Sequence, residues 1–220
     1  MKMESAPFYI RFRPKSAAQL AGDSGKQCAG LLRYVKTRDR ACILIVGPSG
    51  SGKSTIARIL ADSVAGHDLN IHEINAGTEG SIDAIRKIEE SMGLCAWCKG
   101  WRVYIIEEAH NLSKSAQEGL LHVVENYPAQ TLFVFTSTEE KFTPAFMSRM
   151  VTLRLKAISE RDTLDAMAQV CIRAGLSPKD LPVHELRAIA QAAGGNVRQA
   201  LNDLELFLAM NAPAEAALVA

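Results

Sequence analysis

The stretch that decides the fold is Cys42-Ile43-Leu44-Ile45-Val46-Gly47-Pro48-Ser49-Gly50-Ser51-Gly52-Lys53-Ser54. Five apolar residues lead directly into the pattern G-x-x-x-x-G-K-[ST], and a stretch typical of a helix, residues 55–64, follows. A buried strand, a glycine-rich loop and a helix in this order form a phosphate-binding loop. The alternative, a Gly/Ser-rich surface loop, leaves the flanking strand and helix unexplained. The sequence therefore predicts that the chain binds a nucleoside triphosphate.

Each part of the loop has an expected role in holding the triphosphate. The glycines let the backbone approach the phosphates closely, because a Cβ would obstruct that approach. Backbone N–H groups at the start of the helix would surround the α- and β-phosphates. Lys53 would reach the β- and γ-phosphates, and the Ser54 hydroxyl would bind Mg²⁺. The expected nucleotide-binding residues of the loop are Gly47, Pro48, Ser49, Gly50, Ser51, Gly52, Lys53, Ser54 and Thr55.

Composition limits the class of protein. The 220 residues are 48% hydrophobic and 22% charged, with a net charge of +1, as is ordinary for a globular chain with a real core. No global attraction to nucleic acid or to an anionic membrane is built in, so any DNA contact must come from a local patch. Five cysteines are an odd number, which disfavours a disulfide framework. No apolar stretch is long enough for a bilayer span. We expect a cytoplasmic, or nucleoid-associated, protein without a membrane partner.

Short apolar runs alternate with helical patterns over residues 1–156. Such βα alternation predicts an α/β three-layer domain with a parallel sheet, in which each strand is buried on both faces. The expected strands are Cys42–Val46, Ile71–Ile74, Val103–Ile106, Leu132–Phe135 and Val151–Leu155. The expected helices between them are Ser54–Val64, Ile82–Met92 and Lys114–Glu125.

After Leu155 the pattern predicts helices only. Ser159 is a candidate N-cap for a helix to about Ala174, and Asn196 is one for a helix over Val197–Met210. Between them, Pro182 would sit in the first turn of a helix that runs to Ala193. These segments predict a small three-helix domain over residues 157–212, followed by a tail, residues 213–220.

Two acidic residues follow the apolar run 103–106. Glu107 and Glu108 end a strand that would lie beside the phosphate loop. One carboxylate in such a place can hold Mg²⁺, commonly through water, and the next can polarise an attacking water molecule. We assign Glu107 to the metal and Glu108 to the water. Adjacent acids on a turn are otherwise simply solvated charges.

The motifs together resemble those of the clamp-loader ATPases of the AAA+ class. The resemblance spans about residues 8–210 in order. It is carried by Phe12-Arg13-Pro14-Lys15 with Leu20-Ala21-Gly22, the phosphate loop, Ile74-Asn75-Ala76-Gly77, Glu107–Lys114, Thr136–Arg149 and Gly194–Asn202. It implies an AAA+ P-loop fold with a helical lid, and ATP with Mg²⁺ as ligands.

The resemblance also implies roles for single residues. Arg13 and Pro14 would line the adenine pocket, and Arg198 would contact the triphosphate from the lid as sensor 2. Ser137 or Thr136 would fill the sensor 1 position and orient water or the γ-phosphate. Arg149 would be an arginine finger that acts in trans on a neighbouring subunit's site.

The implied partners are other copies of the chain, other loader subunits, a sliding clamp and primer-template DNA. DNA phosphates would meet helix N-termini at Arg86 with Lys87 and at Ser113 with Lys114. Taken singly, each of these Lys and Arg residues fits a solvated surface charge better than a DNA contact.

Some features depart from the family pattern. Glu107 stands where the family usually has Asp, which would slow hydrolysis while binding survives. The sequence ends after the lid, without the helical collar expected of the family. Cys95 and Cys98 form only half of a zinc site, so we expect ordinary thiols; the alternative is a metal site shared with another subunit. Two alternatives stay open: a Holliday-junction branch-migration motor, and an ATP-binding scaffold with little turnover.

Overall fold

The structure is a computed structural model that describes residues 6–78, 85, 88, 99–177 and 181–211. Its centre is a five-stranded sheet in the order β2-β3-β4-β1-β5, and every neighbouring pair is parallel. The strands are β1 (Arg40–Val46), β2 (Ile71–Asn75), β3 (Arg102–Glu107), β4 (Thr131–Ser137) and β5 (Val151–Arg154). All five predicted strands and their parallel arrangement are confirmed, so the α/β fold class is correct.

The two edge strands differ from the prediction. β1, β3 and β4 are almost completely buried, whereas β2 and β5 are mostly half-buried or exposed. An edge strand pairs on one side only, and the helices above and below cover it less fully. The prediction that every strand is buried on both faces is therefore wrong for β2 and β5.

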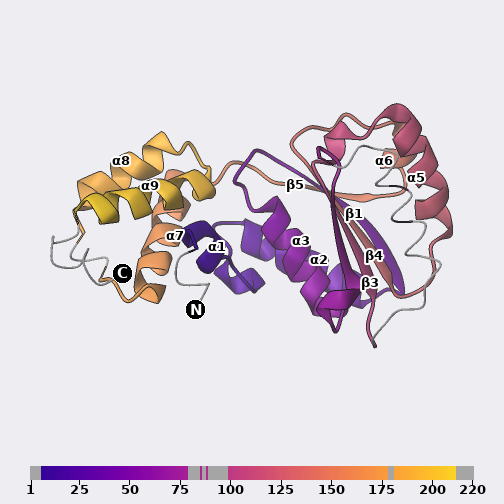
Figure 1. Cartoon of the computed structure of the whole chain (residues 1–220), viewed down its shortest axis with the longest axis horizontal. Coiled ribbons are helices and arrows are strands. Elements are labelled where there is room, and N and C mark those ends of the chain that lie inside the picture. The colour runs from indigo at the N-terminus through magenta and orange to yellow at the C-terminus, as the bar shows by residue number, and fades with distance from the viewer. Residues whose placement is uncertain (1–5, 79–84, 86–87, 89–98, 178–180, 212–220) are drawn as a thin grey trace.

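Helices cover both faces of the sheet (Figure 1). α2 (Ser24–Lys36) and α3 (Lys53–Val64) pack on one face, where the buried strand residues include Ile43, Ile105 and Val134. α5 (Lys114–Asn126) and the short α6 (Pro144–Met147) pack on the other face, against the rings of Phe133 and Phe135. The alternation of side chains along each strand separates these two cores and gives the three layers.

Some helices were predicted and others were not. α3 and α5 match their predicted ranges within one residue. α2 was not predicted, although Cys28, Leu31 and Val35 line its buried side at helical spacing. Most of the predicted helix Ile82–Met92 lies outside the described residues; Ile85 and Ile88 are helical. Short elements also went unpredicted: α1 (Phe8–Arg11), η1 (Ala17–Gln19), η2 (Asp68–Asn70), η3 (Ala109–Asn111) and α6.

Three helices follow β5, as predicted: α7 (Glu160–Arg173), α8 (Val183–Ala192) and α9 (Val197–Met210). Ser159 Oγ accepts a hydrogen bond from Asp162 N at 3.1 Å, and Asn196 Oδ1 accepts one from Gln199 N at 3.2 Å. Both residues are therefore the N-caps that the sequence indicated. Pro182 immediately precedes α8 instead of lying in its first turn.

The helical part has its own core, and the amino-terminal segment joins it. Phe8 and Phe12 of the α1 region pack with Met167, Leu186 and Leu204 from the three helices. Figure 1 shows α1 beside α7 and away from the sheet. The division at residue 156 stays a prediction, and the tail 213–220 lies outside the described residues. No helix in the described part of the chain is long and apolar enough to cross a membrane.

Candidate nucleotide-binding site

The phosphate loop connects the end of β1 to the first residue of α3. Gly50 and Gly52 have φ values of +73° and +95°, which favour glycine. A Cβ added to Gly50 would lie 1.8 Å from Asn196 Oδ1, so only glycine fits there. Among the described side chains, none caps the start of α3. Its first-turn N–H groups are thus available for an anion, and the loop fits a triphosphate.

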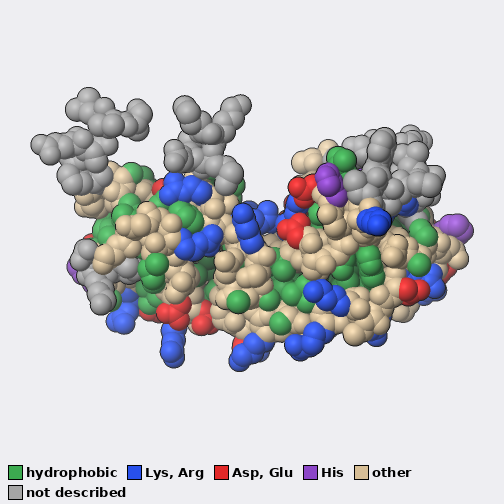
Figure 2. All heavy atoms as spheres, turned by 90° about the horizontal axis from the view of Figure 1, so that it is seen from below, with side chains coloured by type: hydrophobic (Ala, Val, Ile, Leu, Met, Phe, Trp, Pro, Cys, Tyr) green, Lys and Arg blue, Asp and Glu red, His purple; other side chains and the backbone are tan. Residues whose placement is uncertain are grey.

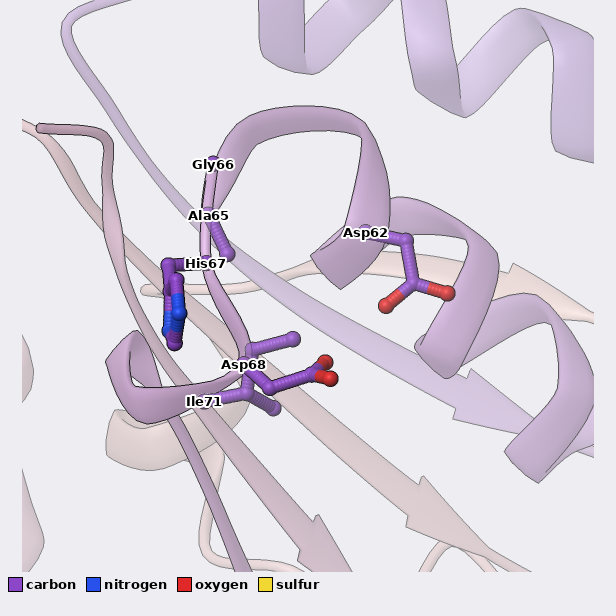
Figure 3. A pocket seen from close by; sticks show the side chains of 6 residues that line it. All are labelled: Asp62, Ala65, Gly66, His67, Asp68 and Ile71. Carbon is purple, nitrogen blue, oxygen red and sulfur yellow. The ribbon is translucent and has the colours of Figure 1, made fainter. Parts of the chain in front are cut away.

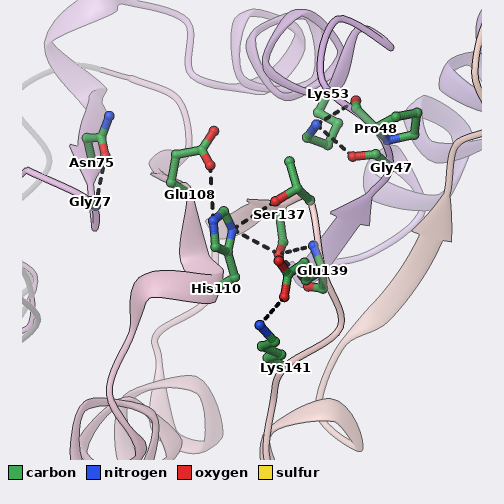
Figure 4. Close-up of polar contacts among 11 residues, drawn as sticks. Gly47, Pro48, Lys53, Asn75, Gly77, Glu108, His110, Ser137, Glu139 and Lys141 are labelled. Atoms are coloured by element: carbon green, nitrogen blue, oxygen red, sulfur yellow. Dashed lines mark hydrogen bonds and ion pairs between the residues drawn. The ribbon is translucent and has the colours of Figure 1, made fainter.

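Lys53 is buried at the base of the loop. Its side chain is only 7% exposed, and Nζ donates hydrogen bonds to Gly47 O at 2.8 Å and Pro48 O at 2.9 Å (Figure 4). Burial lowers the pKa of Lys53 below its usual 10.5, against the opposing effect of the carboxylates of Glu108 and Glu107. The guanidinium of Arg198 lowers the same pKa. Charged groups at the end of β3, in the turn after it and in α9 therefore act on the Lys53 ammonium group.

The acidic pair lies where β3 ends. Glu107 is the last residue of the strand, and Glu108 has φ 53° and ψ 39°, the left-handed conformation. This conformation is uncommon for a residue other than glycine, and such residues cluster at functional sites. Among the described residues, no three His, Cys, Asp or Glu form a metal cluster. Mg²⁺ does not need one, because it commonly takes one or two protein oxygens with phosphates and water, a set that Ser54 and Glu107 fit.

The carboxyl end of β4 carries the two sensor 1 candidates. Thr136 and Ser137 are both buried, and their side chains point to opposite faces of the sheet because they are adjacent in a strand. Ser137 Oγ donates to Glu139 O at 2.5 Å and lies 3.4 Å from His110 Nδ1. Gly47 N donates to Ser137 O at 3.2 Å, which joins β4 to the loop. Ser137 is thus the candidate on the side of the acidic turn.

Two predicted nucleotide contacts come from the ends of the chain. Arg13 Nε donates to Thr55 Oγ1 at 3.3 Å, so the Arg13-Pro14 segment reaches the first turn of α3. Arg198 is exposed in the first turn of α9, with its guanidinium carbon 5.6 Å from the ring centroid of Tyr9. Figure 2 shows the surface hollowed between the helical part and the sheet, with basic and acidic side chains bordering the hollow.

Arg149 lies in a different environment. Its Nε donates to Glu125 Oε1 at 2.7 Å, while Nη1 donates to Ala145 O at 3.0 Å and to Ser148 Oγ at 2.7 Å. These partners belong to α5 and to the α6 region, and the side chain is 40% exposed. Among the described residues, no hydrogen bond or ion pair of Arg149 involves the phosphate loop. The arginine expected to act in trans is therefore not brought to this chain's own site.

Of the residues predicted to contact DNA, Ser113 and Lys114 can be placed. Both are exposed at the start of α5, where Ser113 Oγ accepts from Ala116 N at 3.2 Å as the N-cap. Arg86 and Lys87 lie outside the described residues, as do Cys95 and Cys98.

A pocket of about 380 Å³ lies at the far end of α3 from the phosphate loop (Figure 3). Its lining consists of Asp62, Ala65, Gly66, His67, Asp68 and Ile71. Arg58 pairs with Asp62 and Asp68 beside it, at 2.8 and 2.5 Å. The pocket is separate from the site that the sequence predicted.

Three residues at these sites carry no role in the sequence interpretation. His110 contacts Glu108 and the end of β4, Asn196 touches Gly50 as well as capping α9, and Glu125 holds Arg149. Asn196 was identified only as a cap. His110 was placed only in the turn of the acidic motif and Glu125 only in the segment after it. Their partners could not be predicted, because those depend on how distant segments pack.

Sequence comparisons point to replication proteins. Residues 66–159 match the family model described as DNA polymerase III, delta subunit. The DNA polymerase III subunit gamma/tau of Mycobacterium tuberculosis is 27% identical over 225 residues, covering 91% of this chain and 38% of the relative. The replication factor C small subunit of Thermoplasma volcanium is 27% identical over 205 residues, covering 89% of this chain and 62% of the relative. The chain thus spans less than two thirds of these relatives.

Solved structures agree on the fold. The Holliday junction branch migration motor RuvB of Thermotoga maritima aligns with a TM-score of 0.69 and 21% identity, covering 90% of this chain and 66% of that one. A DNA polymerase III gamma subunit-related protein of Thermotoga maritima aligns with a TM-score of 0.57 and 16% identity, covering 86% and 74%. The chain is therefore similar in sequence to the DNA polymerase III gamma/tau and replication factor C small subunits, and it shares its fold with RuvB and the gamma subunit-related protein.

Proposed function

We propose that the chain is an ATP-hydrolysing subunit of a sliding-clamp loader, which opens a clamp and places it on primed DNA during replication. The observation that carries the ATPase part is Lys53, buried at the base of a loop in which Gly50 and Gly52 have positive φ, with Nζ bound to the carbonyls of the loop. The charges of Glu108, Arg198 and Glu107 also act on its ammonium group. A basic residue in a phosphate loop, an acidic pair and a lid arginine are the groups that phosphoryl transfer to water requires. The sequence relatives support the clamp-loader part.

The proposed roles follow from the chemistry of each side chain. Lys53 and the first-turn amides of α3 hold the phosphates, and Arg198 meets them from α9. Glu108 orients the attacking water and accepts its hydrogen bond, while Ser137 marks the γ-phosphate side of the site. Mg²⁺, held through Ser54 and Glu107, would supply charge stabilisation on the phosphate oxygens when bound. Arg13 and Pro14 border the nucleotide from the amino-terminal segment.

The site is proposed to be completed by a neighbouring subunit. Arg149 is half exposed and pairs with Glu125 on the far side of the sheet from α3. A guanidinium that cannot reach its own site, yet is presented at the surface, suits the stabilisation of charge in an adjacent subunit. Identical copies arranged in a ring or spiral would complete each other's sites in this way.

DNA contact is proposed at the N-terminus of α5. Ser113 and Lys114 are exposed there, and a helix N-terminus with a lysine attracts phosphate without reading base sequence. Such a contact suits a loader that recognises primed DNA by its shape.

The test is ATP hydrolysis by the chain with and without a clamp and primed DNA, alongside its other loader subunits. Full stimulation only when clamp and primed DNA are both present supports the proposal. Stimulation by branched DNA without a clamp would instead support a branch-migration motor, which the RuvB fold match keeps as the second candidate. Tight nucleotide binding without turnover under every condition would support the scaffold.

A further inference from the structure

We propose that His110 is a positioning residue, which holds the Glu108 carboxylate relative to the end of β4. The inference rests on the proposed ATPase function, in which Glu108 orients water. It assigns a role to a side chain that lies between two groups of the site (Figure 4).

The two ring nitrogens of His110 face different partners. Nε2 lies 3.4 Å from Glu108 Oε2, and Nδ1 lies 3.4 Å from both Ser137 Oγ and Thr138 Oγ1. The ring is 19% exposed, so packing restrains it, while the carboxylate that it contacts is 45% exposed. The ring thus bridges β3 and β4, whose carboxyl ends both border the phosphate loop.

Hydrogen-bond accounting fixes which atom donates. The 3.4 Å contact between Nε2 and Glu108 Oε2 is an ion-pair contact. Because a carboxylate only accepts, a hydrogen bond across this contact requires the hydrogen on Nε2. In the neutral ring Nδ1 is then an acceptor. The Ser137 hydroxyl already donates to Glu139 O, so the Thr138 hydroxyl is the donor to Nδ1.

Among the described residues, the Lys53 ammonium group also interacts electrostatically with Glu108. Glu139 pairs with Lys141 at 2.5 Å, on the Nδ1 side of the ring. A shift of the β4 end would move Thr138, then the ring, and with it the Glu108 carboxylate. A contact between the γ-phosphate and the end of β4 would in this way change the position of Glu108, the group that orients water.

The first measurement needs no hydrolysis. Imidazole ¹⁵N NMR of the full-length, nucleotide-free chain distinguishes the two neutral tautomers. We expect the Nε2–H tautomer of His110 in the wild type, and a larger Nδ1–H fraction in Thr138→Val and Glu108→Ala. A wild-type Nδ1–H tautomer, or one unchanged in both variants, would overturn the inference whatever the activity.

The second measurement is steady-state hydrolysis under the conditions that stimulate the wild type. His110→Phe keeps the ring shape and removes both hydrogen bonds, so kcat should fall about 10- to 100-fold while KM changes less than about 2-fold. His110→Gln, whose amide can still donate to Glu108, should retain more activity than His110→Phe. The exposed His122 on α5 provides the matched control, His122→Phe, which should be neutral.

Glu108→Gln separates failure of the inference from failure of the proposed function. If Glu108→Gln is inactive and His110→Phe is fully active, the positioning role is wrong and the ATPase proposal stands. If Glu108→Gln hydrolyses ATP at the wild-type rate, Glu108 is not the water-orienting group and both fail. A partial loss of folding in His110→Phe would lower the apparent kcat without changing KM, so circular dichroism and the stoichiometry of nucleotide binding must match those of the wild type before the kcat values are compared.

Discussion

At the scale of single residues, the site is built around charges that do not fully satisfy one another. Lys53 is buried with two backbone carbonyls as its only described hydrogen-bond acceptors. Desolvation disfavours its ammonium form, which is why its pKa is lowered. A bound triphosphate would supply the negative charge that Lys53 lacks. Nucleotide affinity should therefore depend on whether Lys53 is protonated.

We therefore predict that triphosphate affinity falls as the pH rises towards the usual lysine pKa of about 10.4. The free protein loses the Lys53 proton at its lowered pKa, whereas the complex keeps it to a higher pH, so binding takes up a proton in that window. Calorimetry in buffers of different ionisation enthalpy measures this uptake. Lys53→Arg stays charged throughout and should show none; equal uptake by both proteins would contradict the prediction.

At the scale of elements, one contact joins the loop to the helical part. Asn196 caps α9 and lies against Gly50, so the same side chain orders the start of the lid helix and borders the phosphate loop. Its neighbour in the first turn of α9 is Arg198, the predicted sensor 2. We therefore expect capping of α9 and binding of a nucleotide to be linked through this single turn.

Replacement of Asn196 by Ala should lower the free energy of unfolding by about 1 kcal/mol, because an N-cap hydrogen bond is lost. Urea denaturation measures this. Ser159→Ala removes the corresponding cap from α7 and should cost about as much. Only Asn196→Ala should also weaken nucleotide binding, so an equal effect of both variants on binding would refute the link.

Gly50→Ala should weaken nucleotide binding more than it lowers the free energy of unfolding. The new Cβ would meet Asn196 Oδ1 at 1.8 Å, and φ of +73° adds about 1 kcal/mol of backbone strain. The loop must therefore move away from α9. Gly30→Ala, where nothing lies within 4 Å of the added atom, is the matched control and should leave binding unchanged.

At the scale of the whole molecule, the proposed catalytic groups lie on two different surfaces. Lys53 and Glu108 border the phosphate loop, whereas Arg149 is held by Glu125 beside α5. One subunit therefore presents a nearly complete site and, elsewhere, an arginine suited to complete the next.

We predict that assemblies of Arg149→Ala subunits bind ATP within about 2-fold of wild type, but hydrolyse it about 1,000-fold or more slowly. Assemblies of Lys53→Ala subunits should fail to bind. Mixing the two variants should restore part of the hydrolysis, because an intact loop can then meet an intact arginine.

Arg154→Ala is the control for this experiment. Arg154 is exposed and pairs with Glu140, and it should be dispensable. Normal hydrolysis by Arg149→Ala subunits in the full assembly would exclude a shared site.

The sequence by itself determined the parallel α/β sheet, the phosphate loop and the three terminal helices. These depend on local patterns: apolar runs bounded by turns, a glycine spacing, and caps such as Ser159 and Asn196 that act within one helical turn. Tertiary structure alone decided that β2 and β5 are edges, that α1 packs with the helical part, and which partners His110 and Arg149 have. These contacts include pairs far apart in the sequence, such as His110 with Ser137, 27 positions apart, and Arg149 with Glu125, 24 positions apart. Only the packing of the layers brings such residues together.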